Sequence, residues 1–438
     1  MSDTVVGPVD AIIIGAGVIG AAVGYELAKK GWKTLNIDKN SVAGYGSTSA
    51  SCAIIRVHYS TYDGCAIAYE GFKYWESFPE YLEAQPDETL AEFVQCGCMV
   101  YKVDANNKAE TIIARARDLG VPLEEWTPEQ IKQHMPFVDT SRFTPARALD
   151  DPDFGKKAGG EIYGAVYFPT AGYVNDPQLS AQNIAAAAAL KGGQFLYNAT
   201  VTEILKEGGR AVGVKLADGR EIRAKVVVNV AGPHSTKIND MAGVTDGFNI
   251  KTGALKQEVS HVPAPAGYEM GKNAHVISDS DISVYSRPEK GNFVLIGSED
   301  PECDPRIFVD PDDWDDSFSD QWKVQVYRQA QRYPELPVTS PVRGVTALYD
   351  ASDDWIPIYD KTDLPGFYVA IGTSGNQYKN APVAGKLMAE LIEKVEAGHD
   401  HDADPLQFHL ENVGVDVSLG FYSRKREINT ESSMSVLG

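Results

Sequence analysis

The chain has 438 residues, 43% of them hydrophobic, and a formal net charge of −21 at pH 7. This length exceeds what one compact core usually holds, so we expect a globular protein of two domains. The negative charge disfavours binding to nucleic acid or to an anionic membrane, and no apolar run is long enough to span a bilayer. The N-terminus lacks a basic signal region and the five cysteines form no disulfide framework, which predicts a cytoplasmic protein.

The first predicted elements lie between Asp10 and Asp38. Residues 11–14 are a short apolar run typical of a buried parallel strand, and residues 34–37 predict a second such strand. Residues 18–30 between them predict a helix. This order of strand, helix and strand is typical of an α/β domain.

The glycines between the first strand and the helix form the pattern G-x-G-x-x-G. Gly15 permits a sharp turn, Gly17 lets the backbone approach a pyrophosphate, and Gly20 lets the helix pack closely on the strand. The helix N-terminus would direct its amides at the phosphates. Asp38 follows Gly20 by 18 residues, as expected of a carboxylate that binds a ribose 2′-hydroxyl. The pattern predicts a site for FAD or NAD rather than NADP, with further contacts from Val18, Ile19 and Lys39.

A run of small residues follows, from Ala43 to Ala53, before the apolar pattern resumes. Its amides and hydroxyls could contact a flat ligand, although an ordinary surface loop would have the same composition. Arg56 then stands among apolar residues, where an arginine needs an anionic partner, either a structural carboxylate or a substrate. The candidate cofactor contacts in this run are Gly46, Ser47, Thr48 and Ser49.

The middle of the chain leaves the alternation of strand and helix. Residues 59–84 predict a helix, and residues 249–297 predict several antiparallel strands with a hairpin near 288–291. This change of pattern favours a second domain. The acidic runs at 310–320 and 399–404 favour solvated loops over metal sites, so we expect no metal ion.

Two further glycine turns follow buried strands, at 231–232 and at 372–375. The first predicts another strand of the same parallel sheet that reaches the cofactor, although a plain strand-to-helix turn would look the same. The second leads into a helix over 380–397, whose N-terminus can bind an anion. The candidate cofactor contacts in this part are Val201, Ala231, Gly232, Gly344, Gly372, Thr373, Ser374, Gly375, Asn376 and Gln377.

The glycine turn, the run ending in Ile54-Ile55-Arg56, and the block Gly372-Thr-Ser-Gly-Asn-Gln-Tyr-Lys379 together resemble the FAD-dependent amine oxidase group. This group includes monomeric sarcosine oxidase, glycine oxidase, D-amino acid oxidase and the dimethylglycine enzymes. The resemblance covers nearly the whole chain and favours FAD over NAD. It implies an α/β chain with a doubly wound parallel-sheet FAD domain (residues 1–90, 170–248 and 345–438) and an α+β substrate domain on a mainly antiparallel sheet (residues 91–169 and 249–344).

The resemblance also implies catalytic roles. Arg56 and Lys379 match the residues that hold the substrate carboxylate in sarcosine oxidase, and Tyr349 matches a tyrosine near the substrate amine. Two cations at one site are unfavourable unless an anion joins them, and a carboxylate ligand meets that requirement. Structural ion pairs are the alternative. We expect His58 to pack in the core or to cap a helix rather than to act in catalysis.

Three positions depart from the relatives. Ala347 and Ala50 stand where sarcosine oxidase and the dimethylglycine enzymes attach FAD through a cysteine or a histidine, so we expect non-covalent FAD. Leu295 stands where sarcosine oxidase has a lysine that activates oxygen. A cation near the flavin helps to form superoxide, so this change puts rapid reaction with O2 in question.

We therefore expect oxidation of the C–N bond of a carboxylate-bearing secondary or tertiary amine, such as an N-methyl amino acid. Hydride would pass to flavin N5, and the resulting imine would hydrolyse. The electron acceptor stays open between O2 and a quinone or an electron-transfer protein. A flavoprotein subunit of a multi-subunit complex and an NAD-dependent dehydrogenase are further alternatives. The sequence does not name the amine or distinguish a monomer from a homo-oligomer.

Overall fold

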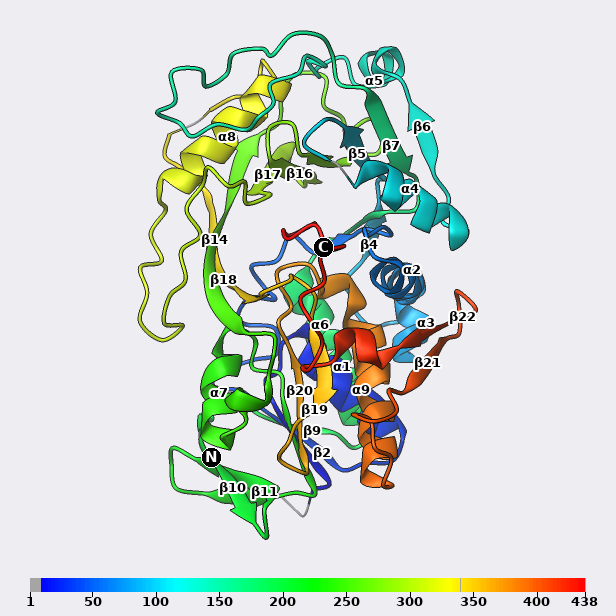
Figure 1. The fold of residues 1–438 in the computed structure, drawn as a ribbon, viewed down its shortest axis with the longest axis vertical. Coiled ribbons are helices and arrows are strands. Elements are labelled where there is room, and N and C mark those ends of the chain that lie inside the picture. The colour runs from blue at the N-terminus through cyan, green and yellow to red at the C-terminus, as the bar shows by residue number, and fades with distance from the viewer. Residues whose placement is uncertain (1–8, 107, 339, 438) are drawn as a thin grey trace.

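The computed structural model describes residues 9–106, 108–338 and 340–437. Its two large sheets lie one beyond the other along the long axis of the molecule (Figure 1). The long strands β14 and β18 extend from the larger sheet toward the smaller one. No helix in the described ranges is long and apolar enough to cross a membrane.

The six-stranded sheet contains the strand–helix–strand unit predicted near the N-terminus. Its neighbours are parallel except for β19 with β20, and β13 pairs with β1 in the register Ala11↔Val226. The prediction that the strand near residue 226 joins the same sheet is therefore confirmed. The strand order is β19 (Ile358–Lys361), β20 (Phe367–Ile371), β13 (Val226–Asn229), β1 (Ala11–Ile14), β2 (Thr34–Ile37) and β9 (Gln194–Leu196).

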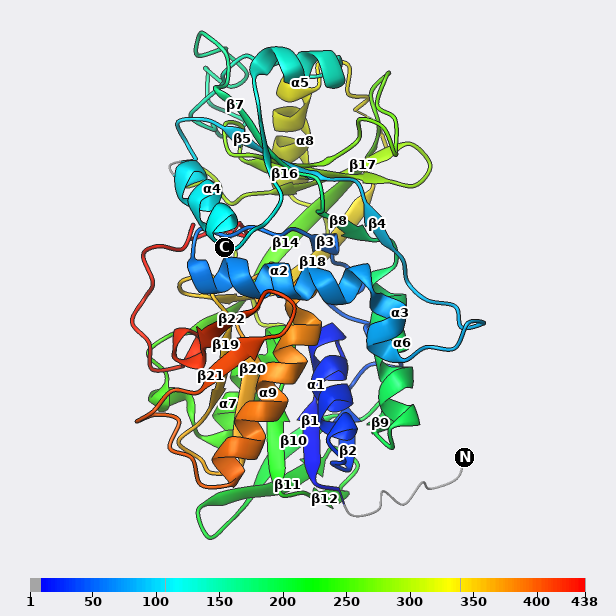
Figure 2. The same cartoon turned by 90° about the vertical axis from the view of Figure 1, so that its right-hand side faces the viewer.

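The two faces of β1 are buried against different layers, because successive side chains of a strand point to opposite sides. Ala11 and Ile13 pack with the helices on one face, which Figure 2 shows in front of the sheet: α1 (Val18–Lys29), α6 (Pro177–Leu190) and α9 (Ala381–Glu396). Ile12 and Ile14 pack on the other face. That face is covered by a small sheet and a helix: β10 (Val201–Glu207), β11 (Arg210–Leu216), β12 (Glu221–Arg223) and α7 (Ser235–Ala242).

The eight-stranded sheet is antiparallel except where β15 and β5 run parallel. Its order is β18 (Gly344–Ser352), β14 (Thr252–Pro263), β17 (Phe293–Ser298), β16 (Val284–Glu289), β15 (Val276–Asp279), β5 (Cys98–Lys102), β7 (Gly164–Phe168) and β6 (Glu124–Trp126). The helix α8 (Asp320–Arg332) packs on this sheet through Trp322 and Val326. Apart from Gly344, the residues of the edge strand β18 fall within the predicted FAD-domain range 345–438.

Smaller elements connect the two sheets. The helix predicted over 59–84 is broken at Ser77, where φ is −117° and ψ is 45°, because Pro79 fits only the first turn of a new helix. The two resulting helices are α2 (Tyr62–Glu76) and α3 (Phe78–Leu82). A three-stranded sheet joins β3 (Ile54–Ile55), β8 (Gly172–Val174) and β4 (Phe93–Gln95). The remaining α-helices of the described residues are α4 (Ala109–Asp118) and α5 (Pro128–His134), the second of which begins with a capping box at Thr127.

The C-terminal part of the chain returns to the middle of the molecule. After the hairpin of β21 (Gln407–Leu410) and β22 (Val415–Ser418), the fully buried Arg424 pairs with Asp360 at 3.0 Å and with Asp402 at 2.9 Å. Arg426 pairs with Asp354 at 2.7 Å. The chain then passes to the region where the two large sheets approach each other, and both views mark its end there (Figures 1 and 2).

Candidate active site

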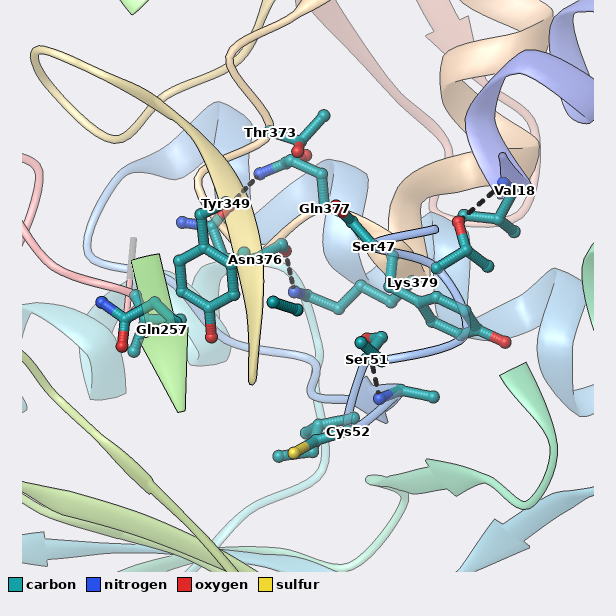
Figure 3. A pocket seen from close by; sticks show the side chains of 18 of the residues that line it. Val18, Ser47, Ser51, Cys52, Gln257, Tyr349, Thr373, Asn376, Gln377 and Lys379 are labelled. Atoms are coloured by element: carbon teal, nitrogen blue, oxygen red, sulfur yellow. Dashed lines mark hydrogen bonds between the residues drawn. The ribbon is translucent and has the colours of Figure 1, made fainter. Parts of the chain in front are cut away.

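The glycine turn between β1 and α1 depends on contacts that only glycine permits. Gly15 has φ of +120°, and a Cβ atom there would lie 2.3 Å from the Val230 carbonyl oxygen. A Cβ atom at Gly20 would lie 2.4 Å from the Gly15 carbonyl oxygen. At the helix start, the Val18 amide donates to the Thr48 hydroxyl at 3.1 Å (Figure 3). This bond joins the run of small residues to the helix end that would face a phosphate.

Asp38 lies beside the same turn, at the end of β2. One carboxylate oxygen accepts a hydrogen bond from the Ala16 amide at 2.8 Å, and the other accepts one from the Asn40 amide at 2.8 Å. These two bonds fix the carboxylate next to the turn, as a ribose-binding acid requires. The contact with the ribose itself stays a prediction.

One large pocket contains many of the predicted site residues, contributed by segments far apart in the chain (Figure 3). Residues of both large sheets line it, from the glycine turn at one end to the predicted substrate residues at the other. The predicted residues that line this pocket are Gly17, Val18, Ile19, Gly20, Ser47, Thr48, Arg56, Gly232, Tyr349, Thr373, Gly375, Asn376, Gln377 and Lys379.

The other predicted cofactor contacts lie outside the lining: Gly15, Asp38, Lys39, Gly46, Ser49, Val201, Ala231, Gly344, Gly372 and Ser374. Sheet packing accounts for Gly344, because a Cβ atom there would lie 2.0 Å from the Val259 carbonyl oxygen. Val201 packs in the core on the other face of the six-stranded sheet. Lys39 pairs with Asp312 at 2.8 Å. A cofactor contact for these residues remains a prediction.

Arg56 and Lys379 meet at a single tyrosine ring. The Arg56 guanidinium lies 4.3 Å from the centre of the Tyr59 ring, and Lys379 Nζ lies 4.7 Å from it. Lys379 Nζ donates to the Asn376 carbonyl at 2.5 Å (Figure 3), and the Tyr59 hydroxyl donates to the same oxygen at 2.6 Å. Arg56 donates to the Val436 carbonyl at 2.8 Å. Both cationic side chains are buried, since Arg56 is 7% exposed and Lys379 is 2% exposed.

Within the described residues, neither cation has a carboxylate at ion-pair distance. Burial, followed by the positive charge of Arg56, lowers the pKa of Lys379 well below its usual value. Burial, and then the charges of Arg56 and Lys379, also lower the pKa of His58 well below its usual value. His58 stacks on Phe168 with ring centres 4.5 Å apart, as a packed histidine would. The pocket therefore holds two basic groups that lack an anion.

Tyr349 belongs to a chain of polar atoms on the opposite wall. Its hydroxyl lies 3.4 Å from the Tyr285 hydroxyl, which lies 3.8 Å from Cys52 Sγ. Burial raises the pKa of Tyr349, so its hydroxyl keeps its proton at neutral pH and can donate a hydrogen bond. In Figure 3, Tyr349 and Lys379 extend toward the same part of the pocket.

A buried carboxyl group holds the turn at 372–375. Asp350 accepts a hydrogen bond from the Gly372 amide at 2.6 Å and from the Ser235 hydroxyl at 3.4 Å, while its carbonyl accepts one from the Ser374 amide at 2.7 Å. Burial raises the pKa of Asp350 to about 7. Asp350 therefore positions the turn, and it lines the pocket itself.

Sequence reasoning missed several lining residues, among them Cys52, Cys98, Gln257, Ser278, Tyr285, Asp350 and Val436. Tyr285 and Gln257 lie on strands that were predicted, and the alternation of side chains along those strands could have identified which ones face inward. No pattern marks Val436, because it lies in an irregular segment whose position depends on distant contacts.

The residues present fit a dinucleotide cofactor. The glycines leave room along the turn, the N-terminus of α1 opens into the pocket through Gly17 and Val18, and Asp38 is held beside it. The pocket then continues past Ser47 and Thr48 to the turn at 373–377. Its lining therefore includes residues from all three of the sequence blocks that resemble flavoproteins. Ala50 and Ala347, the two positions for which the sequence predicts no covalent attachment of FAD, also line it.

The fold and this pocket define a flavin-dependent oxidoreductase. Residues 10–391 match the family described as "FAD dependent oxidoreductase", and the chain belongs to that family. It is 26% identical over 398 residues to sarcosine oxidase subunit beta of an Arthrobacter species, covering 89% of this chain and 88% of that protein. It is 24% identical over 420 residues to glycine oxidase of Geobacillus kaustophilus, covering 93% and 99%.

Solved structures confirm the fold. The crystal structure of L-proline dehydrogenase from P. horikoshii superposes with a TM-score of 0.72 at 22% identity, covering 89% of this chain and 94% of that one. The α/β fold with one parallel and one mainly antiparallel sheet is thus confirmed, as is FAD as the cofactor of the family. Among the described residues, no cluster of three or more His, Cys, Asp or Glu side chains is arranged to hold a metal ion.

Proposed function

We propose that this oxidoreductase acts on the C–N bond of a carboxylate-bearing amine, such as an N-methyl or other secondary or tertiary amino acid. The observation that carries the proposal is the pair of buried basic side chains, Arg56 and Lys379, with no carboxylate at ion-pair distance in the described residues. Two such groups are stabilised when an anion joins them. The names of the relatives, sarcosine oxidase subunit beta and glycine oxidase, agree with a small amino acid as that anion.

The chain's own residues would bind and orient this substrate. Arg56 and Lys379 hold the carboxylate, while the Tyr349 hydroxyl is available to the amine from the opposite wall. The pocket is mostly apolar around them, which disfavours a charged ammonium group and so favours the neutral amine needed for oxidation. FAD, when bound, supplies the acceptor for the hydride at N5. The imine product then hydrolyses in water to an amine and an aldehyde or oxo acid.

Paired substrates test this function. The purified, FAD-loaded protein is mixed anaerobically with sarcosine or with dimethylamine, which lacks only the carboxylate, and flavin absorbance is followed. We expect bleaching with an amino acid and little with its decarboxylated partner. Arg56→Met should abolish that preference. Equal rates of flavin bleaching with sarcosine and with dimethylamine would contradict a carboxylate clamp.

A dehydrogenase that uses the same half-reaction is a second candidate. Leu295 on β17 is only partly buried and packs against the apolar cluster at the pocket, so this position offers no cation to assist O2. Electrons would then go to a quinone or an electron-transfer protein. Oxygen consumption on addition of substrate would exclude this candidate, whereas turnover only with an artificial acceptor would support it.

A subunit of a larger complex is the third candidate, because one relative is named a subunit of sarcosine oxidase. In that case the isolated chain would bind FAD but no amine would bleach it. Mass measurement of the purified protein by light scattering would also distinguish a monomer from a homo-oligomer.

A further inference from the structure

The segment from Glu431 to Leu437 contributes to the same pocket as the predicted substrate residues. Val436 and Leu437 line the pocket directly. The Val436 carbonyl accepts the hydrogen bond from Arg56, so this segment touches the group that would bind the substrate carboxylate. The Val436 side chain is 8% exposed and packs in an apolar cluster with Cys52 and Tyr285, both of which also line the pocket.

The position of this segment is fixed by its backbone. Three side chains donate to its carbonyl groups: Ser60 to Glu431 at 2.7 Å, Arg306 to Met434 at 3.1 Å, and Arg56 to Val436 at 2.8 Å. Upstream, the buried ion pairs of Arg424 and Arg426 anchor the chain before it reaches the pocket. The backbone path therefore does not depend on which side chain stands at position 436, and that side chain is free to determine the shape of the pocket.

The segment lies beyond residues 10–391, the part of the chain that matches the family. A substrate carboxylate on Arg56 would place the rest of the substrate near the apolar cluster that contains Val436. In an apolar pocket, one methylene group more or less changes kcat/KM by roughly 10- to 200-fold.

We propose that residues 431–437 form one wall of the substrate site and that Val436 sets the size of the amine substituent accepted beside Arg56. This inference rests on the proposed function for the placement of the carboxylate. Val436 is a specificity-determining residue in this arrangement, and the carbonyl of the same residue positions the Arg56 guanidinium.

The test compares substrates of increasing size. The kcat/KM of the FAD-loaded protein is measured for sarcosine, N-ethylglycine and N-butylglycine in wild type, Val436→Ala and Val436→Phe. We expect the ratio for N-butylglycine over sarcosine to rise about tenfold or more in Val436→Ala and to fall about tenfold or more in Val436→Phe. Ile428→Ala is the matched control, since Ile428 lies three residues before the segment, is 52% exposed and lies outside the pocket.

A binding measurement separates this inference from the proposed function. Titration calorimetry with acetate and hexanoate gives the ratio of their dissociation constants without any turnover, and Val436→Ala should favour hexanoate. Deletion of residues 430–438 should shift the kcat/KM ratio and the ratio of dissociation constants in the same direction as Val436→Ala. Unchanged ratios in Val436→Ala and in the shortened chain would overturn the inference even if amino acids are oxidised. A changed ratio of dissociation constants in a protein that oxidises no carboxylate-bearing amine would support the wall and refute the proposed function alone.

Discussion

Replacing Lys379 by methionine removes one of the two pocket cations while keeping an unbranched side chain of similar length. Lys379 is 2% exposed, and burial together with Arg56 disfavours its charged form. The Asn376 carbonyl that loses the lysine as a donor keeps the Tyr59 hydroxyl at 2.6 Å. The substitution therefore leaves no buried acceptor without a partner. We expect a free energy of unfolding equal to or higher than that of wild type, because an apolar group in place of a buried charge is often neutral or stabilising.

Substrate binding should change in the opposite direction. A hydrogen bond to a charged group contributes about 1.5–3 kcal/mol. At about 1.4 kcal/mol for each factor of ten, its loss lowers kcat/KM roughly 10- to 150-fold for a substrate with a carboxylate. The same substitution should leave kcat/KM for an amine without a carboxylate within about threefold of wild type, since that amine makes no use of the cation.

Steady-state kinetics and thermal unfolding of the same preparations measure both effects. Lys386→Met is the control, because Lys386 lies on α9 after the pocket residues and pairs with Glu411 at 3.3 Å outside the pocket. Lys386→Met should change neither the free energy of unfolding nor kcat/KM. A Lys379→Met protein that loses stability and keeps its kcat/KM for amino acids would refute the reasoning, because Lys379 would then be a structural group.

Four further predictions concern the electrostatics and the cofactor site. A bound carboxylate should raise the lowered pKa of Lys379, so that ligand binding takes up protons and weakens as the pH rises from the pKa of the free protein to that of the complex. Calorimetry in buffers of different ionisation enthalpy measures this proton uptake. The absence of uptake at every pH would contradict the prediction. The Asp350 carboxyl has a pKa raised to about 7, so it contributes stability below its unfolded pKa that is lost as the pH rises to about 7. Urea unfolding should therefore show Asp350→Asn gaining stability relative to wild type between pH 5 and pH 8, and an equal difference at both values would argue against this. Acid precipitation should release all flavin into the supernatant, because Ala50 and Ala347 offer no attachment, and a yellow pellet would show a covalent bond. Gly15→Ala should lose FAD and fold poorly, since its Cβ atom would lie 2.3 Å from a carbonyl oxygen.

The parts of the site that depend on neighbouring residues could be predicted from the sequence. The turn from Gly15 to Gly20 and the acid at Asp38 belong to one local unit, whose spacing alone defines its geometry. The residues Arg56 and Lys379 are more than 300 positions apart, and only the resemblance to a family brought them together before the structure placed them at one tyrosine ring. Their roles toward a substrate stay predictions.

The parts that depend on the path of the whole chain could not be predicted. Nothing in the local pattern near Val436 indicates that it reaches Arg56, because the contact is fixed by the ion pairs of Arg424 and by distant hydrogen bonds. Asp350 likewise looks like an ordinary end of an edge strand, and only the fold shows that it holds the turn at Gly372. The break of the helix at Ser77 could have been predicted from the nearby Pro79. The apolar residues on both sides of Ser77 nevertheless keep the spacing of a single helix, which led to the prediction of one helix.

The bonds that β18 makes to Ser47 and to the turn after β20 restrict how the molecule can open. Leu348 accepts a hydrogen bond from Ser47 at 2.8 Å, and Asp350 accepts bonds from Gly372 and Ser374 at 2.6 and 2.7 Å. All three cross from the antiparallel sheet to segments of the cofactor site. A rigid rotation of one sheet away from the other would break these three bonds together, and Ser47, Leu348 and Asp350, which make them, line the pocket. Opening the pocket by such a rotation would therefore break all three bonds at once, whereas the displacement of a single segment would break fewer of them.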